Sequence, residues 1–196
     1  LDGRALLASA RTGSGKTAAY ALPLLQRWAT LAGQSPRRTR ALVLVPTREL
    51  AAQVEESVRT YSKYLPLRAA VVYGGIDIKP QIKALHTGVE IVVATPGRLL
   101  DHLQQKSISL SQVSILVLDE ADRMLDIGFR DDIEWLLSRC PRDRQTMLLS
   151  ATLPPAILEL ATRYMNAPKM VNFSSSKVSA ETIDQYYLMV PEELKF

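Results

Sequence analysis

A glycine-rich segment near the amino terminus combines the residue types that bind phosphate groups. The segment reads Ala10-Arg11-Thr12-Gly13-Ser14-Gly15-Lys16-Thr17. Between a strand and a helix, such glycines let backbone N–H groups approach phosphate oxygens, and the helix points its amino end at them. Lys16 then reaches the β- and γ-phosphates, and the Thr17 hydroxyl binds Mg²⁺. The strict pattern has glycine in place of Ala10, and the alternative is an ordinary glycine-rich turn before a helix.

An acidic cluster follows a buried apolar run about a hundred residues downstream. Asp119-Glu120-Ala121-Asp122 comes directly after Ile115–Leu118, at the carboxyl end of an expected strand. Open α/β sheets place ligand-binding groups at that end. One carboxylate there holds Mg²⁺, and a second orients and deprotonates the attacking water in a nucleotide triphosphatase. The alternative is an acidic first turn of a helix, which the helix dipole favours; the phosphate loop upstream argues for the catalytic interpretation.

Short apolar runs recur along the chain and must form the elements that position these groups. They are Ala5–Ala8, Ala41–Val45, Ala69–Val72, Ile91–Ala94, Ile115–Leu118 and Met147–Leu149. Continuous runs of three to five residues are typical of strands buried on both faces of a parallel sheet. Segments with helical spacing lie between them, including the stripe from Leu50 to Leu65 and the segment after Gly128 that carries Ile133, Leu136 and Leu137. The alternation predicts an α/β fold with a mostly parallel sheet and helices on both faces.

Other features of the sequence predict local structure. Pro23 should kink or break the helix that follows Lys16. Gly33–Arg40 is typical of a solvated basic loop, Ser174–Ser176 of a linker, and Ile183–Val190 of a further strand.

The isolated histidines and tryptophans have no partner pattern that indicates a metal or a catalytic triad. We expect His86 and His102 to be surface or helix residues, and Trp28 and Trp135 to pack rather than to bind a ligand.

The composition excludes several classes of protein. The chain has 196 residues, 47% of them hydrophobic, and no apolar run near the roughly 18 residues that span a bilayer, which excludes an integral membrane protein. The single cysteine, Cys140, excludes an internal disulfide framework and a cysteine-rich zinc site. A net charge of +4 permits a polyanionic partner without requiring one. We expect an intracellular protein, in the cytoplasm or, for a eukaryotic source, in the nucleus or nucleolus.

Four more motifs follow the expected strands. They are Pro46-Thr47-Arg48-Glu49-Leu50-Ala51, Gly74-Gly75, Thr95-Pro96-Gly97-Arg98 and Ser150-Ala151-Thr152. Together with the phosphate loop and Asp119–Asp122, which spells DEAD, they make six elements in one order. In these motifs the chain resembles the first RecA-like lobe of a DEAD-box RNA helicase.

The resemblance also implies a domain division. Residues 1–173 would form the ATP-binding lobe, and residues 174–196 the linker and first strand of a second, truncated lobe. The amino terminus, Leu1-Asp2-Gly3-Arg4, has neither an initiator Met nor a secretory signal, and we interpret it as a cut end. The family's upstream adenine-reading element would then be missing.

The resemblance further implies roles for individual residues. Ala10–Thr17 would bind ATP, with Lys16, Asp119 and Glu120 catalytic, Thr17 and Asp119 on Mg²⁺, and Glu120 acting on the hydrolytic water. Asp122 would pair with Ser150 and Thr152 and couple the nucleotide site to RNA. The residues along one RNA strand would be Pro46, Thr47, Arg48, Gly74, Gly75, Thr95, Pro96, Gly97 and Arg98.

The function that the resemblance implies is an ATP-dependent RNA helicase, whose RNA-stimulated ATP hydrolysis drives local duplex unwinding or remodelling of RNA–protein complexes. Backbone N–H groups, Thr hydroxyls and arginines bind phosphates and do not read bases, so RNA binding should be independent of sequence. A second lobe would supply an arginine finger, and this lobe alone should be nearly inactive. Two alternatives stay open: a two-lobed ATPase that acts on DNA, and an RNA clamp that binds ATP without unwinding.

Overall fold

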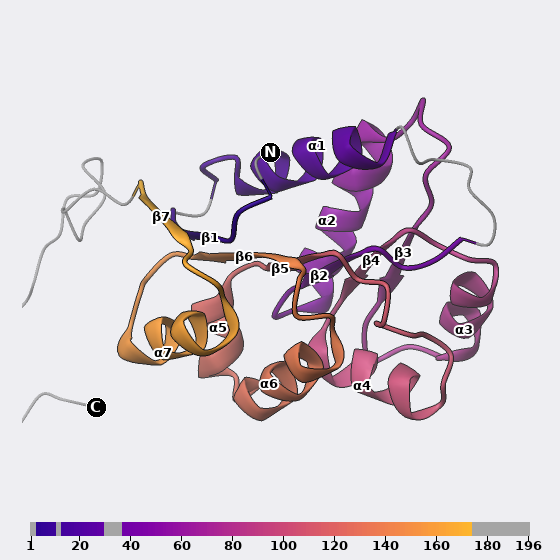
Figure 1. Cartoon of the computed structure of the whole chain (residues 1–196). Coiled ribbons are helices and arrows are strands. Elements are labelled where there is room, and N and C mark those ends of the chain that lie inside the picture. Colours follow the sequence, from indigo (N-terminus) through magenta and orange to yellow (C-terminus); the bar gives the residue numbers. More distant parts are fainter. Residues whose placement is uncertain (1–2, 11–12, 30–36, 174–196) are drawn as a thin grey trace, which may run out of the picture.

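Figure 1 shows the computed structural model of the chain, which describes residues 3–10, 13–29 and 37–173. The elements in chain order are β1 (Leu6–Ser9), α1 (Lys16–Ala29), β2 (Ala41–Leu44), α2 (Arg48–Tyr61), β3 (Ala69–Val72), α3 (Lys79–His86), β4 (Ile91–Ala94), α4 (Pro96–Gln104), β5 (Ile115–Leu118), α5 (Ala121–Asp126), α6 (Arg130–Arg139), β6 (Gln145–Ser150), α7 (Pro155–Tyr164) and β7 (Lys169–Asn172). The expected alternation of strands and helices is confirmed.

All seven described strands form one parallel sheet with the order β3-β4-β2-β5-β6-β1-β7. Six of them match the predicted apolar runs to within about two residues. The seventh, β7, escaped the sequence analysis because it lies at the edge of the sheet. Its residues, Lys169–Asn172, are mostly exposed and have no continuous apolar run.

Each face of the sheet has its own apolar core, and together they explain why the strands have no polar alternation. On one face, α1 and α2 pack against alternate strand residues such as Val43 and Val93. On the other face, α3 to α7 cover the intervening residues, such as Leu44 and Ala94. Figure 1 shows these two helical layers above and below the sheet.

Pro23 was predicted to kink or break the first helix, and a break does not occur, because α1 runs without interruption from Lys16 to Ala29. Proline deprives the carbonyl four residues earlier of its hydrogen bond. That carbonyl belongs to Ala19, and both residues line a cavity rather than a packed interface. The buried residues Tyr20 and Leu24 anchor the helix to the sheet on either side of this point.

The helices predicted after Pro46 and after Gly128 are confirmed as α2 and α6. Ile133, Leu136 and Leu137 are buried on α6 as expected. On α2 the apolar stripe is shorter than predicted, since Tyr61 in its last turn is 42% exposed.

Both histidines lie on helices as predicted, and one expectation, that of a solvated basic loop, is corrected at Arg37. His102 is fully buried on α4, whereas His86 is exposed at the end of α3. Arg37 is not simply solvated, because it forms an ion pair with Glu90, which is buried. Trp28 packs in the core, but Trp135 is half-exposed.

Residues 33–36 of the predicted basic loop, the predicted linker and the predicted strand at Ile183–Val190 lie outside the described residues. Within the described residues, no helix is long and apolar enough to cross a membrane.

Candidate functional site

The sheet brings the sequence motifs to one edge, because parallel strands end on the same side. Each motif follows the carboxyl end of a different strand. The strand order places Gly74-Gly75, Thr95–Arg98 and Pro46–Arg48 after β3, β4 and β2, and Asp119–Asp122, Ser150–Thr152 and the glycine-rich loop after β5, β6 and β1. We call the first three strands with their motifs the β3-β4-β2 half of this edge, and the other three the β5-β6-β1 half.

The glycine-rich loop leads from β1 directly into the amino end of α1. Gly13 and Gly15 have positive φ angles of 81° and 83°, a conformation that side chains disfavour. Lys16 begins α1, and its Nζ donates a hydrogen bond to the carbonyl of Ala10 at 2.9 Å. The lysine thus reaches back across the loop; Arg11 and Thr12 lie outside the described residues.

Asp119 at the end of β5 is the most deeply buried acid of the edge, with 2% of its surface exposed. Its Oδ2 accepts a hydrogen bond from the Tyr20 hydroxyl at 3.1 Å, and its Oδ1 accepts one from the Glu120 N–H at 3.0 Å. Burial raises the pKa of Asp119, although the Tyr20 bond and the charge of Lys16 oppose the shift. Burial and the neighbouring Asp119 also raise the pKa of Tyr20. The groups that donate hydrogen bonds to this carboxylate are therefore neutral.

Glu120 adopts a left-handed backbone conformation that is rare outside glycine. Its φ and ψ angles are 51° and 50°, and it lies immediately before α5. Such strain persists only where the surrounding structure imposes it, and it concentrates at functional sites. The side chain forms a 3.3 Å ion pair with Arg123 on the first turn of α5. The turn therefore places Glu120 next to Asp119, with its side chain only partly buried.

Asp122 on α5 is bonded to the end of β6. Its Oδ2 accepts hydrogen bonds from the backbone N–H of Thr152 at 2.9 Å and from the Thr152 hydroxyl at 2.8 Å. The Ser150 hydroxyl, which is fully buried, accepts a 3.3 Å bond from the Asp122 N–H. Burial alone would raise the pKa of Asp122, but the bonds from Thr152 and Ser150 bring it below its usual value. The structure therefore brings together the three residues that the sequence analysis grouped.

The motif after β2 provides both the cap of a helix and an exposed arginine side chain. Thr47 is the residue before α2, and its hydroxyl oxygen accepts a 3.3 Å bond from the Leu50 N–H. Arg48 is 62% exposed and pairs with Glu49. One Arg48 guanidinium nitrogen lies 3.2 Å from the position that a Cβ would take at Gly75. Glycine at this position, with a φ angle of 83°, thus allows the two motifs to lie side by side.

The motif after β4 begins α4. Thr95 precedes the helix without a capping bond from its side chain, and Pro96 occupies the first turn, where its missing N–H costs nothing. Arg98 is only 13% exposed and donates two 3.0 Å bonds to the carbonyl of Ile76, next to the Gly74-Gly75 pair. The sequence analysis assigned Arg98 to RNA alone; the structure adds an internal role, because the guanidinium holds the neighbouring loop.

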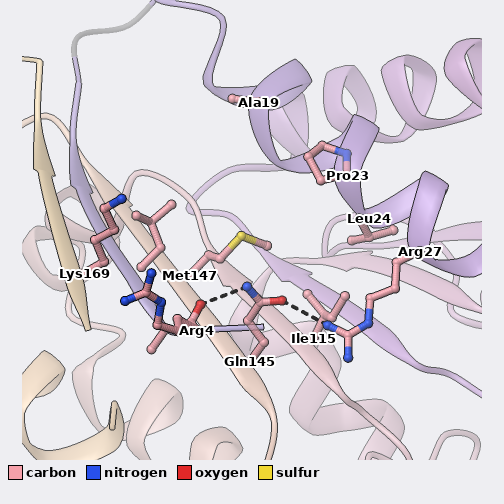
Figure 2. Close-up of a pocket in the computed structure, with 11 residues that line it drawn as sticks. Arg4, Ala19, Pro23, Leu24, Arg27, Ile115, Gln145, Met147 and Lys169 are labelled. Atoms are coloured by element: carbon pink, nitrogen blue, oxygen red, sulfur yellow. Dashed lines mark hydrogen bonds between the residues drawn. The ribbon is translucent and has the colours of Figure 1, made fainter. Parts of the chain in front are cut away.

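The cavity shown in Figure 2 lies at the opposite ends of the strands. It has a volume of about 300 Å³ and lies between α1 and the first residues of β1, β5, β6 and β7. Gln145 crosses it, accepting a 3.3 Å bond from Arg27 and donating a 2.8 Å bond to the carbonyl of Arg4. Among the described motif residues none lines it, so it is not the predicted nucleotide site.

Comparison with known proteins tests the resemblance that the motifs suggest. The sequence profile of the family described as DEAD/DEAH box helicase matches residues 1–160. The chain belongs to this family. It is 44% identical over all 196 residues to the DEAD-box ATP-dependent RNA helicase CshA of Streptococcus pneumoniae, and 43% identical to the ATP-dependent RNA helicase CshA of Listeria monocytogenes. It spans 37% of the length of each.

Solved structures of DEAD-box proteins share the fold. A DEAD box protein from Methanococcus jannaschii is 43% identical and superposes with a TM-score of 0.80, over 87% of this chain and 46% of that protein. A yeast DEAD-box splicing factor is 33% identical, with a TM-score of 0.84 over 90% and 43% of the two chains. The predicted RecA-like α/β fold is thereby confirmed.

The donor set of the β5-β6-β1 half suits a hard cation held together with a ligand. Among the described residues, no three His, Cys, Asp or Glu side chains cluster as a metal site of their own. Mg²⁺ commonly binds through one or two carboxylates plus substrate phosphates, so such a cage is not needed. Asp119 offers the carboxylate and Thr17 a hydroxyl at the start of α1. These oxygen donors fit Mg²⁺.

Two residues of the edge escaped the sequence analysis. Tyr20 binds Asp119, and its position four residues after Lys16 on α1 is the signal that would have placed it beside the loop. Gln81 bonds the loop that carries Gly74-Gly75, but nothing in the local pattern distinguishes it from an ordinary helical glutamine.

Proposed function

We propose that the chain is the ATP-binding lobe of an ATP-dependent RNA helicase, in which RNA-stimulated ATP hydrolysis drives local duplex unwinding or remodelling of RNA–protein complexes. The observation that carries this proposal is the bonded pair of Asp122 and Thr152. It connects the acidic cluster after β5 to the end of β6, next to the loop after β1. The relatives named above are ATP-dependent RNA helicases.

In this proposal ATP binds across the loop Ala10–Thr17. Backbone N–H groups at Gly13 and Gly15 face the phosphates, and the amino end of α1 favours their negative charge. Lys16 exchanges the carbonyl of Ala10 for a phosphate oxygen, which its 2.9 Å bond across the loop supports. A charged phosphate is the stronger partner for an ammonium group.

Asp119 and Thr17 would hold Mg²⁺, which supplies positive charge to the phosphoryl group that is transferred. The buried Asp119 carboxylate gains a compensating charge in this way. Glu120 would orient the attacking water and accept its proton. Its position directly after Asp119, in a strained turn that leaves the core, supports this assignment.

RNA would bind along the β3-β4-β2 half. The donors are the hydroxyl hydrogens of Thr47 and Thr95, the guanidinium of Arg48, and backbone N–H groups of Gly74, Gly75 and Gly97, with Arg98 at the same surface; Pro46 and Pro96 shape the turns. None of these groups reads a base edge, so binding is independent of sequence. Asp122 follows β5, the strand that pairs with β2 of the other half, and together with Ser150 and Thr152 it would couple the two halves.

A second lobe in the full-length gene product would complete the RNA channel and supply an arginine finger. Its absence would leave ATP turnover near background, because such an arginine contributes about 10³–10⁵ in rate. Residues 174–196 would begin that lobe. We propose an intracellular location, where ATP and RNA are both present.

The test is phosphate release by the full-length gene product with no nucleic acid, with single-stranded RNA and with single-stranded DNA of the same sequence. The proposal expects stimulation by RNA and little by DNA. Equal stimulation by DNA would favour the DNA-directed ATPase, and ATP binding without turnover in the presence of RNA would favour the clamp.

A further inference from the structure

A buried hydrogen-bond chain connects α4 to the loop that carries Gly74-Gly75. His102 on α4 is fully buried, and its Nε2 lies 3.2 Å from Oε1 of Gln81 on α3. Nε2 of Gln81 donates a 3.0 Å bond to the carbonyl of Tyr73, the residue before the two glycines. On the other side of the ring, Nδ1 of His102 lies 2.7 Å from the Ser107 hydroxyl.

Chemistry fixes the direction of each bond in this chain. The Tyr73 carbonyl can only accept, so the Gln81 amide must point its NH₂ at it and its oxygen at His102. Nε2 of His102 therefore carries the hydrogen and donates. Burial and the charge of Arg98 lower the pKa of His102, which favours the neutral ring. With the hydrogen on Nε2, Nδ1 can only accept, and the single hydroxyl hydrogen of Ser107 is shared between Nδ1 at 2.7 Å and the His102 backbone carbonyl at 3.0 Å.

This chain and Arg98 hold the loop at its two ends. Gln81 bonds the carbonyl of Tyr73 on one side of the glycines, and Arg98 bonds the carbonyl of Ile76 on the other. Both residues connect the loop to α4, because Arg98 lies on α4 and Gln81 is bonded to His102 of the same helix. The loop is therefore fixed relative to the start of α4, the other expected phosphate-binding turn.

Burying a histidine and a glutamine together is costly unless their polar atoms are satisfied, and apolar residues would fill the same space without that requirement. Here the hydrogen bonds of the pair lead to the carbonyl of Tyr73 in the loop. A glycine pair is flexible, and ordering it on binding would weaken affinity.

We propose that His102 and Gln81 are positioning residues for RNA binding, which fix the backbone N–H groups of Gly74 and Gly75 in a preformed phosphate-binding arrangement. The inference rests on the proposed RNA-binding function. His102 and Gln81 touch no RNA themselves and act through the carbonyl of Tyr73.

Two substitutions of the same histidine separate positioning from packing. In His102→Gln the side-chain amide reaches the place of Nε2 and retains the donor to Gln81; in His102→Asn the shorter amide reaches only the place of Nδ1. Gln81→Met removes the bond to Tyr73 at similar volume. Binding of fluorescein-labelled oligouridylate by the full-length gene product is followed by anisotropy. His102→Asn and Gln81→Met should weaken it about tenfold, with the KM for ATP unchanged, and His102→Gln should stay near wild type.

Amide hydrogen exchange at Gly74 and Gly75, without RNA, gives a second readout that stays available if a variant is less stable. It should be faster in Gln81→Met than in wild type, with the amides of β4 unchanged. Wild-type RNA affinity in His102→Asn and Gln81→Met, or equal losses in both His102 variants, would overturn the inference alone. Failure of the wild-type protein to bind RNA would overturn the proposed function as well. Arg48→Ala distinguishes the two outcomes: if it weakens RNA binding while His102→Asn and Gln81→Met do not, the proposed function stands and only the inference fails.

Discussion

In the β5-β6-β1 half of the sheet edge, the charged side chains of Lys16 and Asp119 have neutral hydrogen-bond partners. Lys16 is bonded to a backbone carbonyl, Asp119 is buried with little compensating charge, and Glu120 is carried out of the core by a strained turn. In the β3-β4-β2 half, two of the motif side chains fix the backbone of that half itself. Thr47 caps α2, and Arg98 holds the carbonyl of Ile76.

Under the proposed function, the two halves would bind phosphate groups in two different ways. In the β5-β6-β1 half, the hydrogen-bond partners of Lys16 and Asp119 are neutral groups, so ATP and Mg²⁺ would supply the opposite charges. The β3-β4-β2 half uses side chains to fix backbone geometry, so that neutral N–H groups are preformed. Substitutions in the first half should therefore affect chemistry, whereas those in the second should affect RNA affinity and local order.

The largest effect is expected for Lys16→Ala. Within the described residues, the hydrogen bond of its side chain goes to a loop carbonyl, so its removal should cost little stability but reduce ATP turnover of the full-length gene product by about 10²-fold or more. Phosphate release and thermal melting are measured on the same sample. Lys83→Ala, at an exposed position of α3, is the control and should behave as wild type. Near-normal turnover in Lys16→Ala would remove the basis for the ATP site.

Glu120→Gln should separate binding from hydrolysis. The amide keeps the shape of the side chain but cannot accept a proton, so hydrolysis should slow by about 10²-fold or more. ATP binding, followed with a fluorescent ATP analogue, should stay within a few-fold of wild type. Loss of ATP binding would instead assign Glu120 a structural role through its ion pair with Arg123.

Arg48→Ala and Arg98→Ala compare an exposed and an internally bonded arginine in the same half. Each should weaken binding of any RNA sequence by up to about tenfold. Each should also reduce the slope of log affinity against log salt concentration by about one. Only Arg98→Ala should also lower the melting temperature, because it releases the carbonyl of Ile76. Equal melting temperatures would contradict the internal role of Arg98.

The smallest expected effect is a dependence of the free energy of unfolding on pH that is caused by Asp122. Because the pKa of Asp122 is lowered from its ordinary value of 3.8, its carboxylate stabilises the folded state above that value and ceases to do so as the pH falls through the folded pKa. Asp122→Ala should therefore lower the free energy of unfolding by about 1 kcal/mol at neutral pH. The difference from wild type should shrink in acid. A loss that persists unchanged there would assign it to packing.

Much of the fold and part of the site could be predicted from the sequence. Buried parallel strands such as β2 and β4 have continuous apolar runs, and the glycines of the loop before α1 stand where the backbone needs positive φ angles. The edge strand β7 could not be found in this way, since it buries little. The sequence predicted only a surface or helix position for His102, because its burial and its bond to Gln81 depend on how α3 packs beside α4.

The central claim is that the two halves are coupled through Asp122, and the most direct test is the affinity of the full-length gene product for oligouridylate with and without a non-hydrolysable ATP analogue. We expect the analogue to raise RNA affinity by about tenfold or more in wild type and in Asp126→Ala, a control on the same helix. In Asp122→Ala the increase should fall to about twofold or less, with ATP affinity in the absence of RNA retained. The same increase in Asp122→Ala as in wild type would contradict the account.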